Sequence, residues 1–424
     1  MANLLAENQE QKDQDSQEEV IISPENHIDH NQMMPGTDPV AEPKNKHGFW
    51  KVPDTETYVQ VLGIIKATAA TDISGGDSYP ESNYLYANNI NVPTKNGHNF
   101  RLCARESVFH FQALMPFFDK QKISAHIETD FMGGENTSKD TESCGYDARI
   151  RKAYVHAGNF LVGQTWSGFV DIDSFPETIT AGPVGLPQLR QTLIGYEQRH
   201  KLDVGKLFIR ATIENARSEA KINPQEAAVT AKTANQSPDV ILGAGIDDEN
   251  YKVFLRGVLR RNCVTYNTNT HRKSGYGLAL SGFYKIPEIK DKISFSVAYG
   301  SGIGRYFHDS AGQATYFDER TCLFVNNKTT AGSIGYQHFF GTKYNLRSVI
   351  SCAFMRMGNN EKFVDSTMAS GDKNKQVHSF QINMLGLVAE KFTVGIEFMH
   401  AKRKLENNTS GKLNRLLAMV RFSF

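Results

Sequence analysis

The side chains best suited to chemistry in this chain are arginines set opposite apolar residues. Arg149 and Arg151 alternate with Ala148 and Ile150, so an extended strand puts both guanidinium groups on one face. A guanidinium presents a rigid fork of donors that pairs with a carboxylate in bidentate fashion. A row of such groups is suited to weak, successive binding of carboxylate anions. The arginines with this placement are Arg149, Arg151, Arg210, Arg256 and Arg260.

Carboxylates share the polar faces of these segments, at Glu128, Asp130 and Glu214. Two interpretations of the arginines follow. Each arginine can pair with one of these acidic residues and only stabilise the structure. Alternatively, the arginines together form a surface that attracts anions, and both Arg256 and Arg260 are then expected to face water.

Other motifs point to no catalytic or metal site. Gly300-Ser301-Gly302 with Gly304 resembles a nucleotide-binding loop only loosely, because the GK[ST] ending is missing. His378 precedes Ser379, but no nucleophile elbow surrounds them. The five cysteines have no metal-ligand spacing, and their odd number cannot pair completely within the chain. We therefore expect no cofactor, no metal, no enzymatic activity and no nucleic-acid partner.

The segments that carry these residues alternate with a period of two. In residues 121–132, Ile123, Ala125, Ile127 and Phe131 point one way, and the intervening polar residues point the other. Residues 206–214, 251–260 and 392–398 repeat this pattern, with Phe208 as an exception on a polar face. The last nine residues also alternate and end on Phe424. This pattern is typical of strands in an outer-membrane β-barrel, where every second side chain faces lipid.

The connections between these segments alternate between short and long. Transmembrane barrels have short periplasmic turns and long external loops, so eight long and seven short connections predict sixteen antiparallel strands. Residues 320–325 would break this even number as a separate strand, and we place them in a long loop. A soluble β-sandwich would also alternate, but so many long loops are unusual in one compact domain. The long connections are expected near 72–98, 133–146, 167–188, 215–237, 264–273, 303–329, 357–374 and 403–411.

Composition divides the chain into an N-terminal extension, 1–50, and a barrel, 51–424. Residues 1–50 hold ten acidic and three basic side chains, and we expect them to be disordered or weakly helical. No apolar run approaches the roughly 20 residues that a membrane-spanning helix needs. The start of the chain lacks the features of a secretory signal. An outer-membrane protein requires such a signal, so we expect that it has been removed.

Several stretches in a fixed order resemble the DcaP-type outer-membrane porins. They are Gly163-Gln164-Thr165-Trp166-Ser167, Pro176-Glu177, Gly182-Pro183, Gly300 to Tyr306, Tyr336-Gln337-His338-Phe339, Gly395-Ile396-Glu397-Phe398, Lys402-Arg403 and Asn414-Arg415. The resemblance spans roughly residues 57–424. It implies a trimer of sixteen-stranded barrels that admits small, often anionic solutes such as dicarboxylates. Some members carry a coiled coil before the barrel, whereas residues 1–50 lack heptads.

The third long connection, 167–188, is the candidate constriction loop. By analogy with sixteen-stranded porins, this loop should fold into the lumen. Its charged residues are Asp171, Asp173 and Glu177, with Arg190 near its return. Acidic loop residues facing basic wall residues would create a transverse field that orients dipolar solutes. An ordinary solvated external loop is the alternative.

These observations predict a passive, anion-preferring diffusion channel of the bacterial outer membrane. Its expected partners are outer-membrane lipid and lipopolysaccharide, small anionic solutes, and two further copies of the chain. Two alternatives belong to other classes of protein. One is a lipid hydrolase embedded in a barrel, and the other is a surface adhesion barrel with a plugged lumen.

Overall fold

A computed structural model of the chain describes residues 48–77, 83–95, 97–116, 122–133, 147–180, 182–223, 231–310, 312–358 and 373–424. The extension 1–50 therefore lies almost entirely outside the described residues. No helix within these ranges has the length and apolar character needed to cross a membrane.

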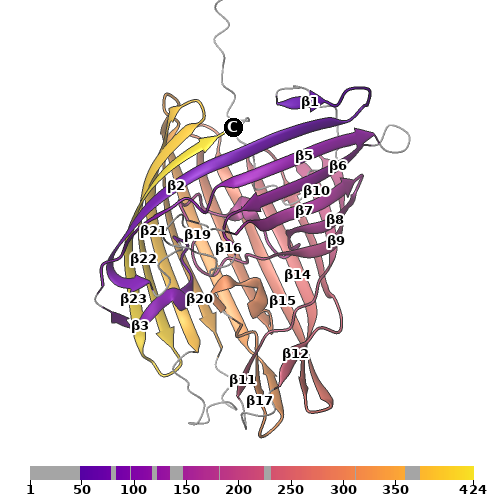
Figure 1. Ribbon diagram of the computed structural model, residues 1–424, viewed down its shortest axis with the longest axis vertical. Coiled ribbons are helices and arrows are strands. Elements are labelled where there is room, and N and C mark those ends of the chain that lie inside the picture. The colour runs from indigo at the N-terminus through magenta and orange to yellow at the C-terminus, as the bar shows by residue number, and fades with distance from the viewer. Residues whose placement is uncertain are drawn as a thin grey trace, which may run out of the picture. The chain divides into compact units, whose positions relative to one another are not determined.

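The described residues form a closed barrel of sixteen antiparallel strands, as the alternation predicts (Figure 1). The last strand pairs with the first from Ile64↔Ser423 to Ser74↔Asn414, which closes the sheet and leaves it without an open edge. The strands are β2 (Tyr58–Asp77), β5 (Val108–Pro116), β6 (Lys122–Asp130), β7 (Arg149–Ala157), β8 (Phe160–Trp166), β9 (Arg190–Leu202), β10 (Gly205–Glu214), β13 (Asp239–Asp247), β14 (Tyr251–Tyr266), β15 (Asn269–Ile286), β16 (Asp291–Ser301), β19 (Lys328–Gly341), β20 (Leu346–Met357), β21 (Asn374–Ala389), β22 (Phe392–Leu405) and β23 (Ser410–Ser423).

Smaller elements lie at the ends of the barrel. The short strand β1 (Phe49–Lys51) pairs with β2, so pairing with the barrel begins just before the boundary expected at residue 50. β3 (Ile90–Lys95) and β4 (Phe100–Cys103) lie between β2 and β5 and pair with β2, and β12 (Lys232–Ala234) pairs with β14. Within the described ranges the loops hold the single-turn helices η2 (Ala87–Asn89), η4 (Ile172–Ser174), η5 (Gly304–Tyr306) and η6 (His308–Ser310).

Two of the predicted long connections are wrong. β14 continues to Tyr266 and β15 begins at Asn269, so segment 264–273 is a tight hairpin instead of a loop. Asn267 adopts a positive φ of 52°, which suits such a turn. Segment 403–411 is likewise reduced to the turn between Leu405 and Ser410. The polar side chains of these segments predicted loops, but backbone pairing between strands can continue into water without apolar side chains.

Residues 320–325 belong to a loop, as expected, and contribute to the short strand β18 (Leu323–Asn326). β18 pairs with β17 (Thr315–Asp318), which in turn pairs in parallel with β11 (Ala220–Asn223). These three strands form a separate small sheet beside the barrel strands. It joins the loop between β10 and β13 to the loop between β16 and β19.

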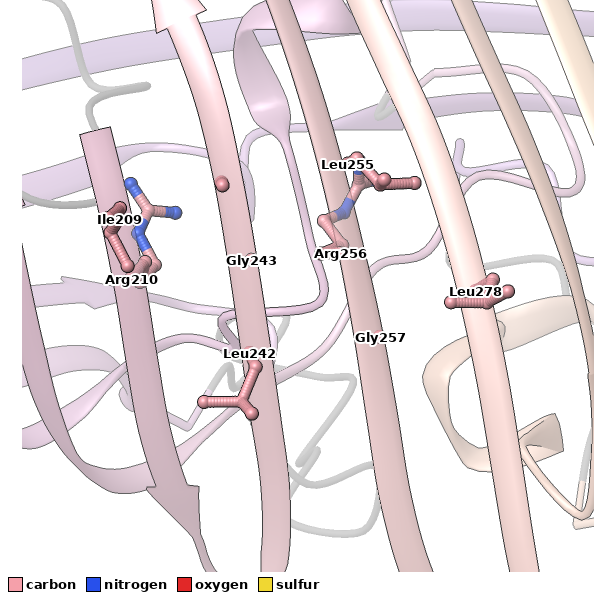
Figure 2. Close-up of a pocket in the computed structure, with 9 residues that line it drawn as sticks. Ile209, Arg210, Leu242, Gly243, Leu255, Arg256, Gly257 and Leu278 are labelled. Atoms are coloured by element: carbon pink, nitrogen blue, oxygen red, sulfur yellow. The ribbon is translucent and has the colours of Figure 1, made fainter. Parts of the chain in front are cut away.

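Alternation sets the two faces of the wall. Leu255 is 55% exposed on the outer face, whereas its neighbour Arg256 is 1% exposed on the inner face. Phe208, the exception in the sequence pattern, lies inside and is fully buried against Phe254. Figure 2 shows a shallow apolar groove between neighbouring strands, lined by Ile209, Leu242, Gly243, Leu255, Gly257 and Leu278. The outer face of the barrel is therefore apolar and the inner face is polar, the reverse of a soluble protein.

We predict that Leu255→Lys destabilises the barrel by roughly 2–4 kcal/mol, because a charge on the lipid face near the midplane is costly. Leu259→Lys is the matched control and should cost roughly 0–1 kcal/mol, because Leu259 is only two residues from the outward-facing Arg261 and so lies nearer the membrane boundary. Denaturant unfolding in lipid vesicles measures both. Equal costs at the two positions would contradict the lipid-facing assignment.

Candidate functional site

The loop of residues 167–189 lies inside the barrel. Its backbone donates hydrogen bonds to side chains of the inner wall, from Ile179 N to Glu397 Oε2 at 2.7 Å and from Val184 N to Ser379 Oγ at 3.2 Å. Lys66 of β2 donates to the Ile179 carbonyl at 2.6 Å. The loop connects β8 to β9, but these contacts are with β2, β21 and β22, which are far from it in the sequence. The loop therefore folds into the lumen, as the sequence predicts.

The carboxylates of this loop anchor it to the wall. Asp171 and Asp173 accept from Lys252 Nζ at 2.8 and 2.5 Å, and Glu177 accepts from Arg347 in a bidentate pair. Burial acts to raise the pKa of Asp171, but the charges of Lys252 and Arg256 outweigh it and lower the pKa to about 2. The acidic loop residues thus face basic wall residues in direct ion pairs. The three acids bind the cations of the wall behind the loop and do not stand free across the lumen.

Two of the five predicted arginines, Arg256 and Arg260, also support loops, whereas Arg210 pairs within the wall. Arg256 donates to the Phe169 carbonyl at 2.9 Å and to Ser281 Oγ at 2.7 Å. Arg260 donates to the Arg217 carbonyl at 2.8 Å and lies 3.5 Å from Asp239. Arg210 pairs with Glu197 at 2.6 Å. These arginines are 1%, 4% and 3% exposed, so the expectation that Arg256 and Arg260 face water is wrong.

Glu214 likewise holds the start of the inserted loop. It accepts from the backbone N–H of Gly168 at 2.7 Å and from Thr212 Oγ1 at 2.7 Å. Gln191 also donates to this carboxylate. Glu214 is 1% exposed, so its carboxylate is buried in these hydrogen bonds and does not face the lumen.

Arg149 and Arg151 face the lumen and are paired with Glu128 and Asp130. Arg149 donates twice to Asp130, at 3.0 and 2.7 Å, and Arg151 bonds Glu128 at 2.6 Å and Asp130 at 3.0 Å. A bulge at Glu128/Thr129 turns Lys152 inward as well, and it bonds Glu128 at 3.0 Å. For Arg149 and Arg151, the interpretation that each pairs with a wall carboxylate is therefore correct.

Arg190, the first residue of β9, differs from the other arginines. Its guanidinium lies 3.7 Å from the centre of the Trp166 ring, in a cation–π contact. Among the described residues, no carboxylate forms a hydrogen bond or ion pair with it, and its Nε has no hydrogen-bond partner. Arg149, Arg151 and Glu128 lie close enough to interact with it electrostatically.

We call Arg149, Arg151, Lys152 and Arg190 the lumen cationic cluster. Glu128 and Asp130 are the carboxylates that pair with it, which leaves an excess of two positive charges. His308 is exposed nearby, and its ring lies 5.7 Å from that of Tyr86. Desolvation, with the charges of Arg190 and Arg149, lowers the pKa of His308 to about 4. His308 is therefore neutral at pH 7 and adds no charge to the cluster there.

Asp309 joins three loops at one point. Its two carboxylate oxygens accept from the backbone N–H of Ala87 at 3.1 Å and of Gly185 at 2.8 Å. Asn374 Nδ2 donates to the Asp309 carbonyl at 3.0 Å. Burial of Asp309 raises its pKa to about 6, and the two N–H groups only partly offset this. The inserted loop is thus fixed at its apex by a carboxylate that titrates near neutral pH.

Sequence analysis missed several residues of this site. Lys252 lies on a predicted polar face, so its inward orientation could be predicted. Its pairing with Asp171 and Asp173 could not. Arg347 and Ser281 are polar positions on strands whose inner face only the structure shows. Asp309 has no sequence signal at all, because its role depends on amides from loops about 120 and 220 residues away.

The described part of the chain holds no metal-binding group and no disulfide bond. No group of three or more His, Cys, Asp or Glu side chains there is arranged to hold a metal ion. Cys103, Cys263, Cys322 and Cys352 form no disulfide bond within the described residues, and Cys144 lies outside them. His378 is exposed on the outer face while Ser379 is buried inside, so these neighbours do not form a catalytic pair.

Comparison with known proteins gives a family and a fold. The sequence profile of the DcaP outer membrane protein family matches residues 19–424. No curated protein gives a significant sequence match. The solved outer membrane channel DcaP of Acinetobacter baumannii is similar, with 21% identity and a TM-score of 0.73 over 88% of this chain and 99% of that one. OmpT of Vibrio cholerae shares 10% identity and a TM-score of 0.53, covering 89% of this chain and all of that one. The anion-selective porin of Comamonas acidovorans shares 11% identity and a TM-score of 0.54, covering 87% and 100%.

We predict that the junction at Asp309 loosens as the pH rises from about 4 to about 6. The folded chain holds the Asp309 proton more tightly than an unfolded chain does, so this group favours the folded state at low pH and loses that contribution above its folded pKa. The loss should be on the order of 1–3 kcal/mol. Unfolding midpoints of wild type and Asp309→Asn at pH 4.5 and 7.5 measure it, and the difference between the two proteins isolates Asp309 from other groups. An identical pH dependence in both proteins would contradict the prediction.

Proposed function

Because the chain belongs to the DcaP outer membrane protein family, we propose that it forms a water-filled diffusion channel that prefers small anionic solutes. A barrel of sixteen strands is wide enough to enclose an aqueous channel. The loop of residues 167–189 narrows the lumen from one wall. The lumen cationic cluster occupies strands β7 and β9, whereas the contacts that anchor the loop come from β2, from β10 and from strands between β14 and β22.

Arg190 carries this proposal. The other arginines of the predicted set are bound to carboxylates or carbonyls, whereas Arg190 is held by the face of Trp166. Stacking fixes the plane of the guanidinium, and because Nε is buried, the two terminal nitrogens are the donors left for a solute. A carboxylate that enters the lumen meets this fork beside two further arginines.

The paired arginines tune the strength of binding. Conduction requires a site that attracts the solute but also releases it. Glu128 and Asp130 cancel part of the positive charge, so an anion meets an excess of two charges instead of four. We infer that dicarboxylates pass by contacting Arg190 with one carboxylate and a neighbouring member of the cluster with the other.

The relatives are consistent with this proposal without establishing it. The Comamonas acidovorans protein is named an anion-selective porin, but at 11% identity its likeness to this chain extends to the fold alone. The Acinetobacter baumannii protein is named an outer membrane channel. No feature of the described residues favours the alternatives of a lipid hydrolase or an adhesion barrel.

A homotrimer in the outer membrane is part of the proposal. Strands β5, β6, β7 and β8 have only seven to nine residues, which makes this side of the wall low. Above them, on β4, Phe100 and Leu102 are 70% and 72% exposed on the outer face. An apolar surface at this height suits a neighbouring copy of the chain. One solved form of Vibrio cholerae OmpT is a trimer, with a TM-score of 0.51 to this chain.

We predict that Arg190→Gln weakens anion preference. Loss of one charge about 4 Å from a passing anion in water is worth about 1 kcal/mol, or roughly fivefold in anion occupancy. Reversal potentials across planar bilayers in a salt gradient measure it. Arg199→Gln is the matched control on the same strand, because Glu197 and Asp247 already pair with Arg199. An unchanged reversal potential for Arg190→Gln would refute the role of Arg190, and cation preference in the wild type would refute anion selectivity itself.

We predict a trimer in mild detergent, which sedimentation should show as three times the 47.4 kDa mass of one chain. The pair Phe100→Asn and Leu102→Asn should dissociate it while the barrel stays folded, as heat-resistant gel migration reports. Leu242→Asn with Leu278→Asn, in the apolar groove of Figure 2, is the control and should remain trimeric. A wild type that sediments as a monomer would contradict this part of the proposal.

A further inference from the structure

A group of cations lies on the outer face of the barrel, near the ends of β19, β20, β22 and β23 that lead into or out of the connections at the loop-bearing end (Figure 1). We call it the external basic belt, and its members are Lys328, Arg356, Lys402, Lys404 and Lys412. The burial pattern of each strand places these side chains on the lipid side. On β22, for example, Lys402 alternates with the buried Ala401 and Arg403 and shares a face with Ile396, which is 64% exposed.

The belt lies where the hydrocarbon of the membrane should end. Phe392 begins β22 at the short-turn end, and Lys402 follows ten residues later on the same face. At about 3.4 Å per residue and a tilt near 40°, Lys402 stands roughly 25 Å above Phe392, which matches the height of the apolar band of such barrels. The external side of this boundary holds the head groups of the outer leaflet.

The belt places like charges beside one another. Lys402 is the direct cross-strand partner of Lys412 on one side and of His378 on the other, and Gln376 is the partner of both Arg356 and Lys404. Like charges directly opposite in a sheet destabilise it. Anions that neutralise such a row therefore stabilise it.

The protein itself supplies little of this neutralisation. Within the described residues, none of the five belt side chains forms an ion pair with a carboxylate, whereas the arginines of the lumen are heavily paired. Glu406, in the turn between β22 and β23, has Lys375, Lys373 and Arg356 near it and offsets one charge. Below the belt the outward residues His400 and Asn414 come first, and Phe354, Phe398 and Leu416 then offer an apolar wall for acyl chains.

We propose that the external basic belt binds a bisphosphorylated glycolipid of the outer leaflet, the lipid A part of lipopolysaccharide. Its phosphates would contact Lys402, Lys404 and Lys412, and its acyl chains would lie along the apolar wall below. Phosphate oxygens form strong charge-assisted hydrogen bonds with ammonium and guanidinium groups. This inference uses the outer-membrane placement of the barrel but does not depend on the selectivity of the lumen.

Binding of defined lipids to the purified full-length protein tests the proposal. Native mass spectrometry in mild detergent compares bisphosphorylated lipid A with the same lipid stripped of both phosphates. The triple variant Lys402→Gln, Lys404→Gln, Lys412→Gln should bind bisphosphorylated lipid A at least about tenfold more weakly, as expected when several charge-assisted contacts are lost. The control variant carries Gln at Lys201, Lys343 and Lys391, exposed lysines at the opposite end of the barrel. It should bind like the wild type.

Three results would overturn the proposal: triple-variant affinity within about twofold of the wild type, equal loss in the control, or equal binding of the lipid without phosphates.

Thermal unfolding provides a second readout. Without lipid, Lys412→Gln should unfold at the same or a higher temperature than wild type, because it removes the repulsion with Lys402. Bisphosphorylated lipid A should raise the unfolding temperature of the wild type more than that of the variant. A variant that is less stable without lipid would show that Lys412 has a structural role instead. Bilayer reversal potentials should be the same for wild type and triple variant, which separates this test from that of the channel.

Discussion

Ion pairs between the inserted loop and the inner wall decide what remains of the lumen. Asp171 with Lys252, and Glu177 with Arg347, hold residues 167–189 against strands β14 and β20. Breaking a buried pair leaves one charge uncompensated and typically costs about 3–5 kcal/mol. Arg256 and Ser281 add hydrogen bonds to the same attachment. Because these contacts fix the loop on this side, the solute route that we propose runs along the wall of β6 to β9, and we infer that the charges on that wall set the selectivity.

The arginines of the barrel therefore have different tasks, although all were predicted from the same alternation. Arg256 and Arg260 support loops, Arg210 pairs with Glu197 of the next strand, and Arg149 and Arg151 are paired with Glu128 and Asp130. Arg190 is held by an aromatic ring, which orients it without cancelling its charge. Selectivity in such a lumen depends less on the number of cations than on how many lack a carboxylate partner.

Sequence alone predicted the barrel well because one rule governs every strand. Lipid outside and water inside force a period of two, which gives the strands and their faces, and the count of connections gives sixteen strands. The inserted third loop was expected by analogy with sixteen-stranded porins. The same rule failed where strands leave the membrane. Tyr266 and Asn269 continue a hairpin in water, where polar side chains no longer mark a loop. It also could not predict contacts inside the lumen. The partner of Asp309 is the backbone of Ala87 and Gly185, and no pattern of side chains records a backbone amide.

The two faces of the wall follow the same electrostatic argument in different solvents. Inside, cations that line the water-filled lumen are neutralised by carboxylates unless an aromatic ring can hold them, as Trp166 holds Arg190. Outside, the lysines of the external basic belt have neither kind of partner among the described residues, and Lys402 faces Lys412 directly across the strand pair. Repulsion of this kind lowers stability unless a bound anion removes it. Uncompensated positive charge thus occurs at two places, and each lies where an anion of different chemistry can reach it: a dissolved carboxylate in the lumen and a lipid phosphate at the membrane surface.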